Sequence, residues 1–331
     1  MTDKFDMKGI CHFGVRCADL VLMPFTLLSA LLLRFWRARG IENTPASRLV
    51  FRSVGLLPIR DHYYEPLFNP KYIRRPLDDA RDLPGIDLNL PAQLELLERF
   101  AFQTELLRLE DKQLEDGVPP FRYDNSCYGS GDAELLYSMI RLLRPSRLVE
   151  IGSGYSTLAA EAAIRENQRT DPGITCEHIC IEPFERPWLR NLGVRVIREL
   201  AELIKPDLFE SLRENDILFI DSSHMIRPQG DVLFIYQSIL PRLRPGVFVH
   251  VHDIFTPRDY PKAWVVDAAI LWNEQYLLEA FLTFNPHFEV VCSLNHLCHE
   301  HQKAVAAKFP RYAAEAARRQ PGAFWMRRSS L

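Results

Sequence analysis

The stretch that decides the fold is residues 149–157, VEIGSGYST, which lies between an apolar run and a helical pattern. Residues 147–151 are predicted to form a buried strand and residues 156–167 a helix. Gly152 lets the chain turn tightly at the strand end, and Gly154 leaves the backbone open to a ligand, because neither has a Cβ atom. The N–H groups at the start of the helix then face that ligand. The order of strand, glycine turn and helix therefore predicts a nucleotide-type binding loop.

The glycine spacing distinguishes two kinds of loop. A dinucleotide fingerprint reads G-x-G-x-x-G, whereas this run is E-x-G-x-G-x-S, with Glu150 before the turn and Ser156 in place of a further glycine. A carboxylate beside the turn suits an amine-bearing or cationic ligand better than a pyrophosphate. The run resembles the first motif, E/D-x-G-x-G-x-G, of the class I S-adenosylmethionine-dependent methyltransferases, in which the loop cradles the amino acid part of the cofactor. The resemblance implies that S-adenosylmethionine is bound by Glu150, Gly152, Ser153, Gly154, Tyr155 and Ser156.

Strands and helices alternate on the C-terminal side of this loop. Further strands are predicted at residues 176–182, 194–198, 216–221, 246–252 and 288–294, and helices at 131–143, 230–243 and 263–284. This alternation predicts an α/β fold, a Rossmann-like doubly wound and mostly parallel sheet, with a helical N-terminal extension. We expect a helical and irregular region over residues 1–118, the methyltransferase domain over 119–300 and a helical tail over 301–331.

Acidic and histidine side chains follow the predicted strands. Glu182 ends the second strand, where an acid can accept hydrogen bonds from both ribose hydroxyls. Asp221, which we also expect to bind the cofactor, ends the fourth strand, and His224 follows it in FIDSSH. His252 and Asp253 end the fifth strand in VHDIF. The carboxyl ends of parallel strands meet at one edge of the sheet, where ligands bind. These runs resemble bacterial small-molecule methyltransferases akin to sugar and antibiotic O-methyltransferases.

Methyl transfer would need mainly positioning, because the methyl group on a sulfonium is already activated. A hydroxyl acceptor also needs a base, and His224 is the first choice because its ordinary pKa lies near neutrality. Asp253 or His252 is the second choice, with Asp221 beside them. A divalent ion such as Mg²⁺ would serve the same purpose, and Asp221, His252 and Asp253 form a plausible ligand set. Two other classes stay open: a Rossmann-like nucleotide-sugar or NAD enzyme, and a non-catalytic cofactor-binding protein.

The amino-acid composition limits the classes of partner that the protein is expected to bind. The 331 residues carry 40 basic and 43 acidic side chains, a net charge of −3, which gives no electrostatic reason to bind nucleic acid. Seven cysteines without a repeated spacing, and a start without a legible signal peptide, favour a reducing, cytoplasmic setting. We therefore expect a small-molecule substrate, and a homo-oligomer stays open.

One apolar segment complicates that picture. Residues 20–33, LVLMPFTLLSALLL, carry no charge, and a basic and aromatic group follows: Arg34, Phe35, Trp36, Arg37 and Arg39. A spanning helix needs roughly 20 apolar residues, and Asp19 and Pro24 also count against spanning. We favour a helix packed onto the main domain. The alternative is a membrane-surface helix over residues 20–36, which would give peripheral membrane contact.

Overall fold

The computed structural model describes residues 7–184 and 186–330, and the chain divides into two compact units, residues 1–73 and 74–331. The second unit holds a seven-stranded sheet in the order β3-β2-β1-β4-β5-β7-β6. Its strands are β1 (Arg147–Ile151), β2 (Glu177–Ile181), β3 (Arg195–Ile197), β4 (Ile217–Ile220), β5 (Phe248–Val251), β6 (Phe288–Ser293) and β7 (Phe324–Arg328). The first five pair in parallel, and β7 runs antiparallel to both β5 and β6. The predicted mostly parallel, doubly wound sheet is confirmed.

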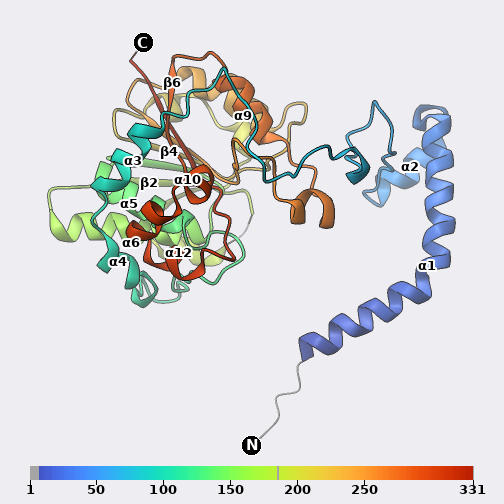
Figure 1. Ribbon diagram of the computed structural model, residues 1–331, viewed down its shortest axis with the longest axis horizontal. Helices are drawn as coiled ribbons and strands as arrows, with labels where there is room; N and C mark the ends of the chain where they lie inside the picture. The colour runs from blue at the N-terminus through green and yellow to red at the C-terminus, as the bar shows by residue number, and fades with distance from the viewer. Residues whose placement is uncertain (1–6, 185, 331) are drawn as a thin grey trace, which may run out of the picture. The chain divides into compact units, whose positions relative to one another are not determined.

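Helices cover both faces of this sheet (Figure 1). One face is covered by α3 (Leu90–Arg99), α4 (Gln103–Leu107), α5 (Asp132–Leu143), α6 (Tyr155–Thr170), α10 (Leu294–Glu300), α11 (Gln302–Lys308) and α12 (Pro310–Glu315). The other is covered by α7 (Asp207–Glu210), α8 (Asp231–Phe234) and α9 (Glu274–Leu282). Successive strand residues point to opposite faces, so Leu148 enters the first hydrophobic cluster and Val149 the second. Single turns complete the unit: η3 (Leu109–Asp111), η4 (Pro187–Asn191), η5 (Ala201–Leu203), η6 (Ile235–Ile239), η7 (Leu240–Arg242) and η8 (Ala263–Asp267).

Two predictions of local structure are wrong. The segment 301–331 is not wholly helical, because β7 pairs with β5 and β6, and its Phe324, Trp325 and Met326 are fully buried there. The helix predicted over 263–284 is interrupted between η8 and α9. There the Asn273 amide donates to the His224 carbonyl (3.0 Å), and the Asn273 side-chain oxygen accepts from the Ile226 amide (2.7 Å). Both differences come from contacts between segments far apart in sequence, which a local pattern does not show.

The domain limits also differ from the expectation. The predicted N-terminal region ended at residue 118, whereas the chain divides after Ile73. Helices α3 and α4 therefore belong to the unit that holds the sheet, where they pack on its first hydrophobic cluster.

The N-terminal unit is helical, with α1 (Met7–Arg39), η1 (Ile41–Asn43), α2 (Pro45–Ser53) and η2 (Pro70–Tyr72). Figure 1 draws α1 as a bent helix, and Pro24 lies inside it, where a missing backbone N–H and a ring clash produce such bends. Its stretch Val15–Arg39 contains an 18-residue window with a mean hydropathy of 1.7 and is long and apolar enough to cross a membrane, by length and composition alone. Packing of this helix onto the main domain stays a prediction.

Candidate active site

The sheet has its topological switch point at β1, which lies between β2 and β4. Open α/β sheets bind ligands at the carboxyl ends of the strands at such a point. Two backbone hydrogen bonds join the strand ends here: the Gly152 amide donates to Ile181 (3.0 Å), and the Asp221 amide donates to Ile151 (2.9 Å). The ends of β1, β2 and β4 thus form one rigid edge.

Gly152 makes the tight turn expected at the end of β1. Its φ is +80°, a left-handed conformation that favours glycine. A Cβ atom at this position would lie 2.1 Å from the backbone oxygen of Asp221. Glycine is therefore required by its conformation and also by the close approach of the β4 end.

Glu150 lies beneath the loop and is only 1% exposed. One carboxylate oxygen accepts from the Ser156 hydroxyl (2.6 Å) and the other from the Thr157 hydroxyl (2.7 Å), with His178 Nε2 at 3.2 Å from the second. Glu150 and Ser156 therefore fix the start of α6 to β1. A direct contact of either side chain with a cofactor stays a prediction, and the geometry instead supports a positioning role for both.

The end of β2 faces the same loop. One oxygen of Glu182 accepts from the Ser153 amide (3.0 Å) and the other from the Phe184 amide (2.9 Å). Each carboxylate oxygen can accept a further hydrogen bond, so Glu182 can still receive ribose hydroxyls. The Ser153 hydroxyl is buried and has no hydrogen-bond partner among the described residues. Tyr155 begins α6 and is half-buried against the hydrophobic core.

A cavity of about 1050 Å³ lies at the carboxyl ends of β4 and β5. Its lining includes Asp221–His224, His252 and Asp253, together with the aromatic side chains of Phe255, Trp264 and Trp272. The segment after β5 therefore lines the cavity. Further walls come from the segment before α5 and from C-terminal residues within 298–322, most of which the sequence analysis assigned to a helical tail beyond the methyltransferase domain.

The structure brings together the four side chains proposed for catalysis. His224 Nε2 lies 3.2 Å from Asp221 Oδ1 and 3.5 Å from Asp253 Oδ2. His252 Nδ1 lies 3.5 Å and 3.6 Å from the same two oxygens. Both imidazoles thus face the same pair of carboxylates. The Asp221 side chain, 33% exposed, is the most open of the four.

Two of these residues have unusual backbone conformations. His224 has φ +57° and Asp253 has φ +58°, in the left-handed region that non-glycine residues rarely adopt. Such positions cost on the order of 1–3 kcal/mol each and persist where surrounding contacts hold them. For His224 these contacts are amide donors from Asn273 (3.0 Å) and Glu274 (3.2 Å) to its carbonyl, and the Glu274 carboxylate on Nδ1 (2.8 Å).

The charges around His224 oppose its role as the base, which stays a prediction. Burial alone would lower the pKa of His224, but its hydrogen bonds to Asp221 and Glu274 outweigh burial and raise that pKa to about 10. A histidine with this pKa is protonated at neutral pH and cannot accept a proton. Burial opposes the ionised form of Asp221, yet His252 and His224 hold the pKa of Asp221 well below its usual range. Burial raises the pKa of Asp253.

The proposed metal ligands fit a divalent cation. Ligand atoms of Asp221, His252 and Asp253 all lie within 4.8 Å of one another. His252 Nδ1 is buried, and its charged neighbours are the Asp221 and Asp253 oxygens at 3.5 Å and 3.6 Å. Two carboxylates and an imidazole nitrogen that face one another form a set that hard or borderline divalent ions accept. On the other side of the ring, His252 Nε2 lies 3.9 Å from Asp132, which can orient it.

Sequence reasoning missed the supporting acids. Neither Glu274 nor Asp132 was predicted to contact the histidines, and no spacing rule relates them to His224 or His252. They reach the site from α9 and α5, on opposite faces of the sheet. The sole signal in the sequence was their charge at positions that proved to be buried.

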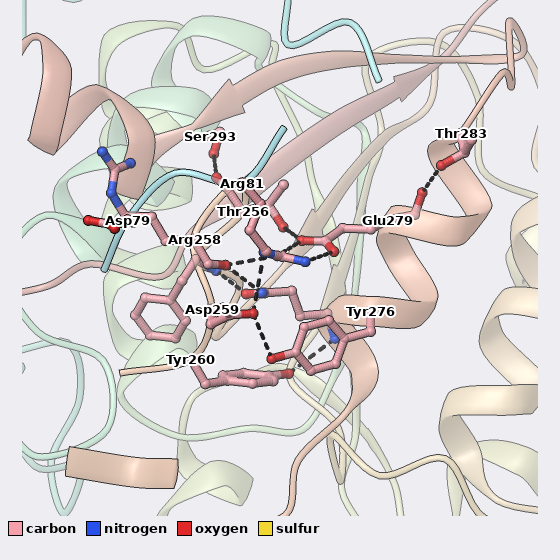
Figure 2. Close-up of polar contacts among 12 residues, drawn as sticks. Asp79, Arg81, Thr256, Arg258, Asp259, Tyr260, Tyr276, Glu279, Thr283 and Ser293 are labelled. Atoms are coloured by element: carbon pink, nitrogen blue, oxygen red, sulfur yellow. Dashed lines mark hydrogen bonds and ion pairs between the residues drawn. The ribbon is translucent and has the colours of Figure 1, made fainter. Parts of the chain in front are cut away.

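A polar network fixes the loop that follows β5 (Figure 2). Arg81 donates to Glu279 (2.7 Å) and to the Arg258 carbonyl (2.9 Å), and the Thr256 hydroxyl donates to Glu279 (2.7 Å). Arg81 and Glu279 have side-chain exposures of only 17% and 8%. This ion pair therefore ties the segment after residue 73 to α9 and to the loop that leads into the cavity wall at Phe255.

The segment that forms this edge of the sheet matches a known protein family. Residues 149–254 match the family model described as a methyltransferase domain. An uncharacterized protein of Archaeoglobus fulgidus is 30% identical over 183 residues, which cover 51% of this chain and 79% of the archaeal protein. The chain belongs to that protein's family and carries a class I methyltransferase domain.

Solved structures with a similar fold are more distant. The O-methyltransferase from Bacillus cereus, in complex with SAH, is 18% identical, with a TM-score of 0.33 and coverage of 59% of this chain and 82% of that one. The O-methyltransferase TomG from Streptomyces achromogenes, involved in tomaymycin synthesis and in complex with SAM, is 15% identical, with a TM-score of 0.31 and coverage of 76% and 92%. At these values neither likeness bears on the substrate of this methyltransferase.

Proposed function

We propose that this methyltransferase transfers the methyl group of S-adenosylmethionine to a hydroxyl of a small molecule bound in the cavity. The observation that carries the proposal is the position of Asp221. Its backbone oxygen touches Gly152 of the glycine loop, and its side chain lines the cavity. One residue thus borders the loop expected to hold the cofactor and the space available to an acceptor.

The loop supports S-adenosylmethionine rather than a dinucleotide. Thr157 stands where a dinucleotide fingerprint has its third glycine, and the hydroxyls of Ser156 and Thr157 both donate to Glu150. Glu182 presents two oxygens at the end of β2, and Ser153 adds a buried hydroxyl without a partner among the described residues. These groups suit a ribose and the polar end of an amino acid.

The cluster at β4 and β5 supplies the proton chemistry. As the acceptor oxygen forms its bond to the methyl carbon, the carbon–sulfur bond breaks and the acceptor loses its O–H proton. Asp253 lines the cavity and takes that proton, while protonated His224 holds Asp253 and Asp221 in place. Asp221, His252 and Asp253 are also the residues that would hold a divalent ion, which when bound would lower the pKa of an acceptor hydroxyl.

Calorimetry tests the cofactor assignment. The chain should bind S-adenosylhomocysteine and not NAD⁺. Glu182→Gln should lose at least tenfold in affinity, because one oxygen that receives the ribose is replaced by an amide donor. Glu177→Gln, an exposed change on the same strand, is the matched control and should bind as the parent does. Binding of NAD⁺ alone would overturn the proposal and favour a nucleotide-dependent enzyme of another class.

Transfer of a radiolabelled methyl group tests the acceptor chemistry. With a panel of phenol, sugar and amine acceptors, label should enter hydroxyl acceptors. Asp253→Asn should reduce turnover at least a hundredfold while keeping the affinity for S-adenosylhomocysteine. Asp267→Asn, an exposed change after the cavity wall, should leave both unchanged. Label in amines alone, or full turnover by Asp253→Asn, would contradict the hydroxyl acceptor or the base, respectively.

A further inference from the structure

Helix α1 is the largest apolar feature that the methyl-transfer site does not use. Four consecutive residues, Leu20 to Met23, are 68%, 72%, 54% and 61% exposed. Successive residues of an α-helix are about 100° apart, so these four alone cover its whole circumference. A helix that is apolar on every side belongs in a protein core or in lipid, and the apolar window of α1 is 0% buried.

The length of α1 fits a bilayer. The 25 residues of Val15–Arg39 extend about 37 Å at 1.5 Å per residue, against a hydrocarbon thickness of about 30 Å. The charge-free run 20–33 covers about 21 Å of it. Asp19 and Arg34 flank this run, and each lies within about a turn of an interface, where a long side chain such as Arg34 reaches the headgroups. Lipid-embedded helices also tolerate a proline such as Pro24.

The residues that follow the apolar run suit an anionic lipid surface. Arg34, Arg48 and Arg52 form no ion pair among the described residues. On α2 the last two flank Leu49 and Val50, which are 68% and 59% exposed, so this short helix presents apolar and cationic groups together. Arginines next to an apolar helix attract phosphate headgroups. Such residues also favour the cytoplasmic side of a spanning helix.

We propose that the N-terminal unit anchors this methyltransferase in a lipid bilayer. Residues 17–36 of α1 span the hydrocarbon and one interface, where the Arg34 side chain reaches the headgroups, and Arg48 and Arg52 of α2 contact anionic headgroups on the same, cytoplasmic side. The anchor is independent of the proposed methyl transfer. It confines the domain, and the acceptor it meets, to a membrane surface.

Flotation of the full chain with vesicles tests the anchor. The parent, transferred from detergent, should float with phosphatidylcholine vesicles and resist extraction by high salt and by alkaline carbonate. The double variant Leu27→Glu/Leu28→Glu should stay in the bottom fraction. Both leucines are exposed, at 62% and 59%, so the change removes no core packing. Leu200→Glu/Leu203→Glu, exposed leucines of the sheet-containing unit, is the matched control and should float like the parent.

The anchor would be overturned if the parent chain does not float, or if the Leu27→Glu/Leu28→Glu variant floats as well as the parent. It would also be overturned if the mature protein begins after residue 39, because α1 would then be a cleaved signal sequence. Binding of S-adenosylhomocysteine by each variant confirms that the domain is folded. A second double variant, Arg48→Gln/Arg52→Gln, tests the contact with anionic headgroups separately. It should still float with phosphatidylcholine vesicles. Adding phosphatidylglycerol to the vesicles should increase the bound fraction of the parent but not of this variant, and an equal increase would show that α2 does not contact the headgroups.

Discussion

The sharpest prediction concerns Gly152→Ala, because two separable strains meet at this residue. The substitution places a methyl group on a residue with φ +80°, and that methyl would lie 2.1 Å from the backbone oxygen of Asp221. Gly193 offers a matched control, since its φ is +79° and a Cβ atom there meets nothing within 4 Å. Gly193→Ala carries the conformational strain alone.

The magnitudes follow from these two environments. Left-handed backbone costs an alanine about 1–2 kcal/mol, partly offset by about 0.4–1 kcal/mol from a stiffer unfolded chain. We therefore expect Gly193→Ala to lower the free energy of unfolding by about 1 kcal/mol. Gly152→Ala adds overpacking against backbone that cannot rotate away, which typically costs about 1–3 kcal/mol. Its loss should be about 2–4 kcal/mol.

Urea denaturation at neutral pH, followed by tryptophan fluorescence and far-UV circular dichroism, measures both losses. Because the clash displaces the end of β4, Gly152→Ala should also weaken S-adenosylhomocysteine by more than tenfold, whereas Gly193→Ala should not. If Gly152→Ala is no less stable than Gly193→Ala, the close contact with Asp221 is not a constraint on the folded protein. The account of this strand end would then be wrong.

Further predictions concern residues that support the site. Glu279→Gln removes one of the two carboxylates paired with the largely buried Arg81 and leaves Asp259 at 3.3 Å, so the free energy of unfolding should fall by about 1.5–3 kcal/mol. The Michaelis constant for the acceptor should rise more than that for the cofactor. Equal changes would argue against a role of the Arg81–Glu279 pair in holding the cavity wall. Burial raises the pKa of Glu134 to about 7, against the amide hydrogen bonds from Arg311, Gly131 and Tyr312 that lower it. The folded protein therefore binds a proton that the unfolded chain has released, and the free energy of unfolding should fall between about pH 5 and pH 7, by up to about 3 kcal/mol. Glu134→Gln should flatten that slope in urea denaturation measured across this range, and an unchanged slope would assign it to other groups.

The conformation of Gly152 was largely indicated by the sequence. VEIGSGYST predicted a strand, a tight glycine turn and a helix, and the structure has β1, a left-handed Gly152 and α6. These features follow from hydrophobic periodicity and backbone sterics over a few neighbouring residues, so no tertiary information is needed. The gathering of Asp221, His224, His252 and Asp253 was also predictable, because the carboxyl ends of parallel strands share one edge.

The protonation of His224 could not be read in the same way. Its ordinary pKa suggested a base at neutral pH, yet hydrogen bonds to Asp221 and Glu274 raise that pKa against the effect of burial. Glu274 comes from a helix fifty residues further along, and its contact depends on the break between η8 and α9. A pKa is set by the charges and burial around a group, and here those are supplied by distant segments.

The amino-acid sequence by itself determined the elements of the sheet, the glycine loop and the apolar character of α1, because each depends on the local order of side chains and on the steric limits of the backbone. Only the tertiary structure decided that β7 completes the sheet, that Glu150 points beneath the loop, and that C-terminal residues wall the cavity. These outcomes depend on pairings between segments up to two hundred residues apart, whose free energy appears only when the chain has folded.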